Sequence, residues 1–334
     1  TCALPICFMI NILMVFTVLI LLMTGVLVIG GNYFYKLAID TGTSKASVFK
    51  SKDNMENSKS AQKETLREKN DKEWFFKNSN YSDVFINSFD GLKLHGYKIV
   101  NSYDTDKWII AVHGYDGDSI KMCGRARNFY NMGFNVIIPD LRGHGQSDGS
   151  YIGMGWHDRK DLLGWIDYII NENNNSEIIL YGISMGASTV MMTCGENLKN
   201  NVKAAIEDSG YTSVWDQFAY ILKCMFKLPQ FPIMYVANII TKMRARYDLK
   251  EASSVNQLAK CKIPVLFIHG DKDKFVPFNM LKKVYDSAKC EKEMLIIEGA
   301  GHCKSNKINP KLYWETISEF LDKYLTYDMN REIM

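Results

Sequence analysis

The sequence predicts an α/β protein: a mostly parallel sheet covered by helices and preceded by one long apolar helix. From about residue 80 onward, short apolar blocks alternate with segments of helical length, which is the pattern of parallel strands joined by crossover helices. Several blocks are apolar throughout, as expected of strands buried on both faces. Residues 1–35 contain no charged side chain and therefore form a separate unit.

The composition excludes several classes of protein. Of the 334 residues, 47% are hydrophobic and 23% are charged, as in a globular chain with a large core. The 40 Lys and Arg against 37 Asp and Glu leave a net charge of +3, which is no basic excess of the kind that nucleic-acid binding requires. The 8 cysteines form no Cys-x-x-Cys pair, which argues against a zinc site.

Residues 1–35 are expected to form a single transmembrane anchor. The stretch 6–29 is almost continuously apolar and exceeds the roughly 20 residues that span a bilayer core. No Ala-x-Ala cleavage pattern follows it, which favours an uncleaved anchor over a secretory signal. A buried core helix is the alternative. Basic residues follow the span and none precedes it, which by the positive-inside rule places the next domain in the cytosol.

The chain after the anchor predicts a linker and then the elements of the sheet. Residues 36–78 are interpreted as a polar linker or a solvated helix between membrane and domain, because they show no apolar periodicity before Trp74. Asp90-Gly91 is a hairpin turn signal, so the sheet begins with an antiparallel pair. Helical spacing of apolar residues predicts a helix over 162–170. The eight expected strands cover 84–86, 92–100, 108–112, 136–138, 178–180, 204–206, 265–268 and 294–297.

A Gly-x-Ser-x-Gly pattern follows the strand expected at 178–180. It comprises Gly182, Ser184 and Gly186, and a helix-like run over 187–198 comes after it. Between a strand and a helix this pattern is a nucleophile elbow, whose tight turn raises the serine hydroxyl above the sheet and leaves room only for glycine on either side. Ser184 is therefore the expected nucleophile.

His302 and Asp273 are the expected base and orienting acid. Asp273 follows the strand at 265–268, and His302 lies in the glycine-rich loop after the last strand. The order Ser, Asp, His along the chain is the order found with a nucleophile elbow. Asp271 and Asp208 are alternatives for the acid, since each also follows an expected strand.

Two backbone N–H groups are expected to bind the oxyanion that develops in acyl transfer. One belongs to Met185, the residue after the nucleophile. The other is assigned by position to Tyr115, in the loop after the strand at 108–112. Neither donor leaves a side-chain signature, so the assignment depends on their place in the chain.

The stretch from about residue 80 to 327 resembles an α/β-hydrolase, of the branch that contains prolyl-aminopeptidase-like and monoacylglycerol-lipase-like serine hydrolases. The motifs are His113-Gly114-Tyr115, Asp140-Leu141-Arg142-Gly143-His144-Gly145-Gln146-Ser147, Gly182-Ile183-Ser184-Met185-Gly186, His269-Gly270-x-x-Asp273-x-x-Val276-Pro277 and Gly301-His302. The resemblance implies an α/β-hydrolase fold and an acyl-enzyme on Ser184, with no metal or organic cofactor. The chain is also similar to bacterial membrane-anchored cell-surface hydrolases, which implies an extracytoplasmic catalytic domain, against the charge count.

An insertion over 211–258 divides the expected core into 79–210 and 259–334. The insertion is strongly apolar, and Pro229 and Pro232 split it into two helices. In the family such an insertion is a lid over the serine. An apolar lid on an anchored enzyme implies a small-molecule or lipid acyl substrate, cleaved at a carboxylic ester or thioester.

Two other functions stay open at this stage. A serine aminopeptidase of the same fold needs a carboxylate in the lid for the substrate amine, and Asp216, Asp248 and Glu251 are the acids there. Peptidases of this branch carry a Gly-Gly-Pro-Gly type loop where this chain has Gly114-Tyr115-Asp116-Gly117, which weakens that reading. The second is a non-catalytic binding protein that keeps the fold.

Overall fold

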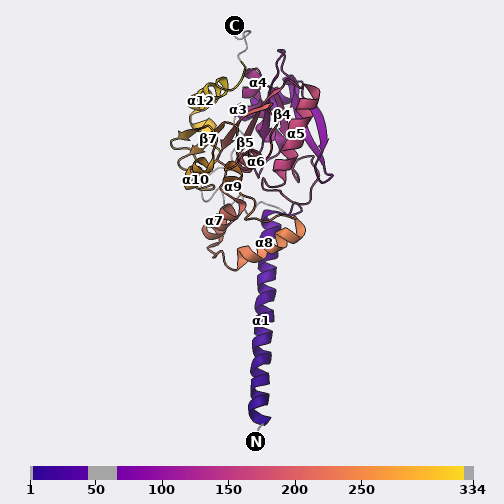
Figure 1. The fold of residues 1–334 in the computed structure, drawn as a ribbon, viewed down its shortest axis with the longest axis vertical. Coiled ribbons are helices and arrows are strands. Elements are labelled where there is room, and N and C mark those ends of the chain that lie inside the picture. The colour runs from indigo at the N-terminus through magenta and orange to yellow at the C-terminus, as the bar shows by residue number, and fades with distance from the viewer. Residues whose placement is uncertain (1–2, 44–65, 327–334) are drawn as a thin grey trace.

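One sheet of eight strands forms the centre of the molecule, with helices on both faces (Figure 1). The computed structural model describes residues 3–43 and 66–326. The strand order is β1-β2-β4-β3-β5-β6-β7-β8. The strands are β1 (Ser82–Asn87), β2 (Lys93–Ile99), β3 (Lys107–Val112), β4 (Asn135–Pro139), β5 (Glu177–Ile183), β6 (Val202–Asp208), β7 (Val265–Gly270) and β8 (Lys292–Ile297).

The predicted strands and their arrangement are confirmed. β1 pairs with β2 and β2 with β4 in antiparallel fashion, and every other neighbouring pair is parallel. The carboxyl ends of β5, β7 and β8 therefore point to the same edge of the sheet, where ligands of such sheets bind. This common edge brings together segments that are more than 100 residues apart in the sequence.

The two faces of the sheet bury two separate hydrophobic clusters. On β3, Trp108, Ile110 and Val112 belong to one cluster, while Ile109 and Ala111 belong to the other. The first cluster includes residues of α5 (Asp158–Glu172), α6 (Met185–Thr193) and α10 (Asn279–Ser287). The second includes residues of α4 (Cys123–Asn131) and α12 (Pro310–Asp322). The short elements are η1 (Ser119–Met122), α9 (Ser254–Leu258) and α11 (Ser305–Ile308).

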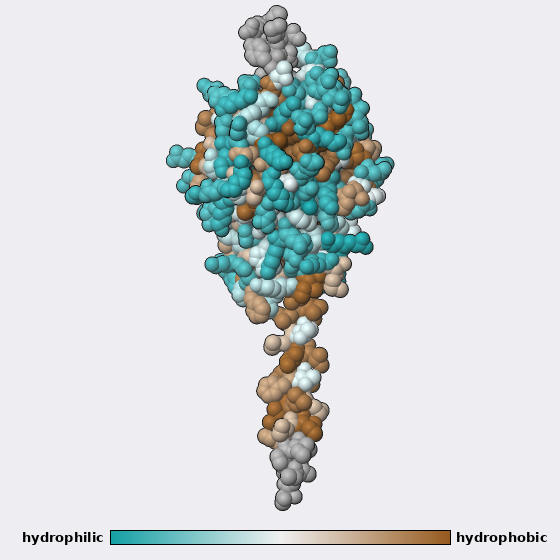
Figure 2. Space-filling model, in the orientation of Figure 1, coloured by the Kyte–Doolittle hydropathy of each residue, from teal (hydrophilic) through white to brown (hydrophobic). Residues whose placement is uncertain are grey.

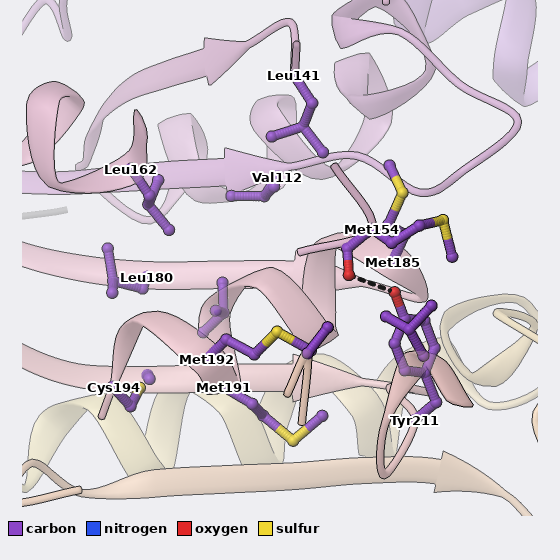
Figure 3. Packing of buried hydrophobic residues seen from close by; sticks show 14 of the residues in the cluster. Val112, Leu141, Met154, Leu162, Leu180, Met185, Met191, Met192, Cys194 and Tyr211 are labelled. Atoms are coloured by element: carbon purple, nitrogen blue, oxygen red, sulfur yellow. Dashed lines mark hydrogen bonds between the residues drawn. The ribbon is translucent and has the colours of Figure 1, made fainter. Parts of the chain in front are cut away.

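Helix α6, which follows the glycine-serine turn, is buried along its whole length. Figure 3 shows Met185, Met191 and Met192 among the side chains of the first cluster, beside Tyr211, whose hydroxyl donates to the carbonyl oxygen of Met154 at 2.9 Å. The helix ends at Thr193, earlier than the predicted residue 198. Beyond it the chain runs so close to α9 that a side chain at residue 195 would overlap Gln257.

The segment 36–78, predicted as a polar linker or a solvated helix, is helical at both of its ends. Helix α1 (Ala3–Ala38) continues past residue 35, and a second helix, α3 (Leu66–Asn78), precedes the sheet. In α3 the ring of Phe75 is fully buried and stacks on Tyr81 at 4.7 Å between ring centroids. Trp74 contacts Tyr130 of α4, and Asp71 pairs with Arg127 of the same helix at 3.2 Å, so ring contacts and an ion pair together hold this polar helix in place. Residues 44–65 of the expected linker lie outside the described residues.

The insertion between β6 and β7 contains two long helices, α7 (Val214–Phe226) and α8 (Ile233–Arg244), followed by the short helix α9. The break between them falls over residues 227–232, which include both prolines that predicted it. Figure 1 shows these helices at the end of the body from which α1 projects, with α8 across α1.

Helix α1 projects from this end as a long apolar rod, and Figure 2 shows that its surface is largely hydrophobic while the body is mostly hydrophilic. Over Phe8–Ala38 it is long and apolar enough to cross a membrane by length and composition, with a mean hydropathy of 3.0 in its most apolar window. None of that window is buried inside the protein, so it is not a core helix of this chain. A helix that is apolar on all sides needs an apolar surrounding.

Candidate active site

The turn between β5 and α6 holds Ser184 in a strained conformation. Its φ of +54° and ψ of −118° are rare for a residue with a side chain, and such strain is found mostly at functional sites. A Cβ on Gly182 would overlap the carbonyl of Gly186, and a Cβ on Gly186 would overlap the carbonyl of Val112. The glycines are therefore required on both sides of the serine, for the reason that the sequence pattern gave.

Ser184, His302 and Asp273 form one chain of hydrogen bonds. The Oγ of Ser184 lies 2.8 Å from Nε2 of His302, and Nδ1 of His302 lies 2.7 Å from Oδ2 of Asp273. The other carboxylate oxygen of Asp273 accepts the N–H groups of Phe275 and Val276, both at 2.9 Å. All three side chains are buried, so solvent competes little for these bonds.

The two alternative acids are engaged elsewhere. Asp271 accepts the N–H of Gly299 at 2.6 Å and pairs with Lys272 at 2.9 Å. Asp208 accepts the hydroxyl of Tyr313 at 2.9 Å. Asp273, which follows β7 by three residues, is the carboxylate that holds the imidazole of His302.

The charges within this chain of hydrogen bonds shift the pKa of both Asp273 and His302. Burial disfavours the Asp273 carboxylate, but the charge of His302 and the hydrogen bonds from His269 and His302 hold its pKa well below the usual range. Burial alone lowers the pKa of His302, but the Asp273 carboxylate, together with Cys303, more than offsets this, so the pKa is raised above its ordinary value. Asp273 is therefore ionised at neutral pH, and its charge makes His302 a stronger base.

The raised pKa of His302 predicts how hydrolysis depends on pH. Protonated His302 has no lone pair at Nε2 for the serine proton, so activity appears as pH rises through the His302 pKa. We expect kcat/KM for a soluble ester to follow one ascending limb with its midpoint above about 6.5, the ordinary value for histidine. The measurement is an initial-rate series with pH-stat detection. A midpoint clearly below that value would contradict the electrostatic role of Asp273.

The loop after β3 passes over the serine. A Cβ on Gly114 would lie 3.3 Å from Cβ of Ser184, so the backbone of this loop reaches the nucleophile closely. The ring of His113 holds the loop in place. Its Nδ1 lies 2.8 Å from the carbonyl oxygen of Gly114, and its Nε2 accepts a hydrogen bond from the N–H of Leu141 at 3.0 Å. Tyr115 and Met185, the expected oxyanion donors, both line the same cavity as Ser184.

That cavity is narrow, with a volume of about 90 Å³ that water-sized groups can occupy. The lid contributes apolar side chains of α7 and α8, among them Phe218, Ile221, Phe226, Ile233 and Met234. A second group of lining residues comes from the end of α1 and the residue after it: Phe34, Tyr35, Leu37, Ala38 and Ile39. None of the lining residues, all of which belong to the described ranges, is a carboxylate or a cation.

Sequence reasoning missed the contribution of α1 to this cavity. The aromatic residues at 33–35 and the following Lys36 are typical of a helix end at a membrane surface, and nothing local distinguishes that pattern from a pocket wall. Sequence reasoning placed Tyr115 at the site through its backbone N–H and missed the role of its side chain, whose hydroxyl donates to the carbonyl oxygen of Ala38 at 2.9 Å. An aromatic residue at the tip of the loop after β3 was the one available signal.

Comparison with known proteins agrees with this geometry. A sequence family described as "Serine aminopeptidase, S33" matches residues 103–254. The uncharacterized protein YqkD of Bacillus subtilis is 31% identical over 238 residues, which are 71% of this chain and 78% of that protein. The α/β hydrolase domain-containing protein WAV2 of Arabidopsis thaliana is 24% identical over 73% of this chain and 79% of its own length.

A similar fold is present in the solved structure of the Pyrococcus furiosus esterase Pf2001. The TM-score is 0.60 at 24% identity, and the match covers 75% of this chain and 92% of the esterase. At that identity the likeness concerns the fold alone. Together with the sequence relatives and the strained serine between strand and helix, it shows that this chain belongs to the α/β-hydrolase family.

Proposed function

We propose that the protein is a serine hydrolase that cleaves an ester-type bond through an acyl-enzyme on Ser184. The observation that carries this proposal is the hydrogen-bonded chain from Ser184 through His302 to Asp273. Oγ of Ser184 attacks the acyl carbonyl carbon while Nε2 of His302 takes its proton. His302 then returns the proton to the leaving alcohol, and Asp273 holds the imidazole in the required tautomer.

The oxyanion is bound by the backbone N–H groups of Tyr115 and Met185 in this proposal. Met185 is the first residue of α6, and the N-terminal end of a helix favours a negative charge. Each such donor contributes about 10²- to 10³-fold in rate. A water molecule, activated by His302, then attacks the acyl carbon and releases the acid.

The lining of the cavity supports an acyl substrate over a peptide with a free amine. An ammonium group needs a nearby carboxylate when it leaves water. Of the lid acids, Asp216 accepts a hydrogen bond from the hydroxyl of Thr212 at 2.7 Å. Asp248 accepts one from the ammonium group of Lys242 at 3.1 Å. Neither these two nor Glu251 lines the cavity. A serine aminopeptidase, the description of the matching sequence family, is the second candidate.

We further propose that α1 is a single-pass anchor and that the catalytic domain lies outside the cytoplasm. Large apolar side chains are exposed on all sides of α1, including Leu13, Leu21 and Val26, and a bilayer is the environment that suits them. The ground for the outward orientation is the resemblance of the sequence to membrane-anchored cell-surface hydrolases, whereas the basic residues that follow the span favour the inward one. Protease access to the domain in intact cells tests it, since an inward-facing domain would be protected until lysis.

The apolar cavity predicts a preference for longer acyl chains. We expect kcat/KM for p-nitrophenyl esters to rise from acetate to octanoate, because each buried methylene adds about 0.8 kcal/mol of binding. The measurement uses the full chain in detergent, with every ester below its own micelle-forming concentration. A steady fall from acetate to decanoate would contradict an acyl-chain pocket, and faster cleavage of aminoacyl-naphthylamides would favour the aminopeptidase.

A further inference from the structure

The end of helix α1 is part of the folded body. Tyr35, Leu37 and Ile39 have exposed fractions of 5%, 6% and 1%. Tyr35 and Ile39 belong to the same hydrophobic cluster as side chains of the central strands. A membrane anchor tethered by a flexible linker would leave these residues accessible, so this segment has a structural role beyond attachment.

Hydrogen bonds hold this segment against the loops at the carboxyl edge of the sheet. The carbonyl oxygen of Ile39 accepts the N–H of Ile152 at 2.8 Å. The hydroxyl of Tyr115 donates to the carbonyl oxygen of Ala38 at 2.9 Å. Tyr115 also lies in the loop that passes over Ser184, so one side chain joins the last turn of α1 to the reacting centre.

The lid holds the same helix from the other side. A Cβ on Gly31 would lie 3.1 Å from the backbone nitrogen of Ala237 in α8, so the two helices cross at close range. Arg244 at the end of α8 donates to the side chain of Asn32 at 2.7 Å and lies over the ring of Tyr35. Phe34 contacts Phe226 of α7 edge-on, with 5.0 Å between ring centroids.

We propose that the last turns of α1 are a substrate-binding element that sets the length of the acyl chain the enzyme accepts. Phe34, Tyr35, Leu37, Ala38 and Ile39 line the cavity together with Ser184, so one wall of the acyl pocket is the end of the membrane helix itself. An apolar chain in this pocket contacts α1 on one side and the lid on the other. The inference rests on the proposed hydrolase function and adds the residues that select the substrate.

The test adds and removes bulk at this wall in the full chain. Ala38→Phe introduces a ring at a lining position, and Phe34→Ala removes one. Lys36→Phe is the matched control, because it adds the same ring to the same turn at an exposed position that does not line the cavity. The readout is the ratio of kcat/KM for p-nitrophenyl decanoate to that for p-nitrophenyl acetate, in detergent.

We expect Ala38→Phe to lower this ratio by about 10- to 100-fold, since each methylene that is excluded costs about fourfold. Phe34→Ala is expected to raise the ratio, and Lys36→Phe to leave it unchanged. Covalent labelling of Ser184 by a small fluorophosphonate reports whether each variant is folded. If Ala38→Phe does not fold, the direction of the change in Phe34→Ala decides.

An unchanged ratio in both lining variants, with Ser184 labelled, would overturn the inference and leave the proposed hydrolase intact. A wild-type protein that hydrolyses neither ester and is not labelled at Ser184 would instead refute the proposed function. An equal effect of Lys36→Phe and Ala38→Phe would mean that any bulk on this turn disturbs the site, and would also overturn the inference.

Discussion

Ser184→Ala is expected to lower kcat for ester hydrolysis by about 10⁴- to 10⁶-fold and to leave the melting temperature unchanged. The substitution removes the one oxygen that attacks the substrate, while His302 and Asp273 keep their mutual hydrogen bond. Alanine occupies less space than serine and adopts the same backbone conformation, so the packing of β5 against α6 is preserved. The measurements are initial rates with a soluble ester and a thermal unfolding curve of each protein.

Fluorophosphonate labelling gives an independent readout of the same prediction. The wild-type protein is expected to carry a single adduct on Ser184 after digestion and mass spectrometry, and Ser184→Ala is expected to carry none. Ser188, a buried serine in α6 whose Oγ accepts the N–H of Tyr211, offers the control Ser188→Ala, in which Ser184 should still be labelled. Retained turnover in Ser184→Ala would refute the acyl-enzyme mechanism, and a folded wild-type protein without adduct would favour the non-catalytic binding protein.

Asp273→Asn is expected to lower kcat by about 10³- to 10⁴-fold, with a smaller change in KM. Asparagine keeps the shape of the side chain, but its amide can donate to Nδ1 of His302 and so stabilise the tautomer whose Nε2 carries the proton. That tautomer cannot accept the proton of Ser184. Loss of the carboxylate also removes the charge that raises the pKa of His302, so the ascending limb of the pH profile should move to lower pH.

The matched controls are Asp271→Asn and Asp208→Asn, the two acids that sequence alone leaves as alternatives. Asp271 is bound to Gly299 and Lys272, so its substitution is expected to lower kcat by less than tenfold. Asp208→Asn disturbs a buried hydrogen bond with Tyr313. It is expected to lower the melting temperature and to change kcat only slightly. A larger loss of kcat in either control than in Asp273→Asn would assign the acid to that residue.

Much of the fold was predictable because its signals are local. The inner strands β3 to β7 are short apolar blocks that are almost fully buried, and burial on both faces of the sheet produces such solid apolar runs. The edge strands β1 and β8 alternate between exposed and less exposed residues. The elbow was predictable for a steric reason, since the overlap at Gly182 and Gly186 excludes other residues. The choice of Asp273 over Asp271 was less certain from sequence, because two residues of loop decide which carboxylate faces His302.

The errors in prediction occurred where burial depends on distant parts of the chain. The segment 66–78 is polar in composition, and its helix is held by the buried ring of Phe75 against Tyr81 and Tyr97. Ion pairs of its acidic residues with Arg127 and Lys307 add to this contact. Helix α6 ends at Thr193, and just beyond it Gly195 lies so close to Gln257 that a side chain would not fit. Periodicity in a short window contains no information about either contact.

The sequence by itself therefore determined where the eight strands lie along the chain, the serine between its two glycines and the apolar character of the N-terminal helix, because each depends on neighbouring residues. Only the tertiary structure decided that Phe34 and Ala38, at the end of that helix, line the cavity of Ser184. Their partners are Phe226, almost 200 residues later in the lid, and the hydroxyl of Tyr115 in the loop after β3. Such a pocket wall forms from surfaces that meet only when the whole chain has folded, so no local pattern specifies it.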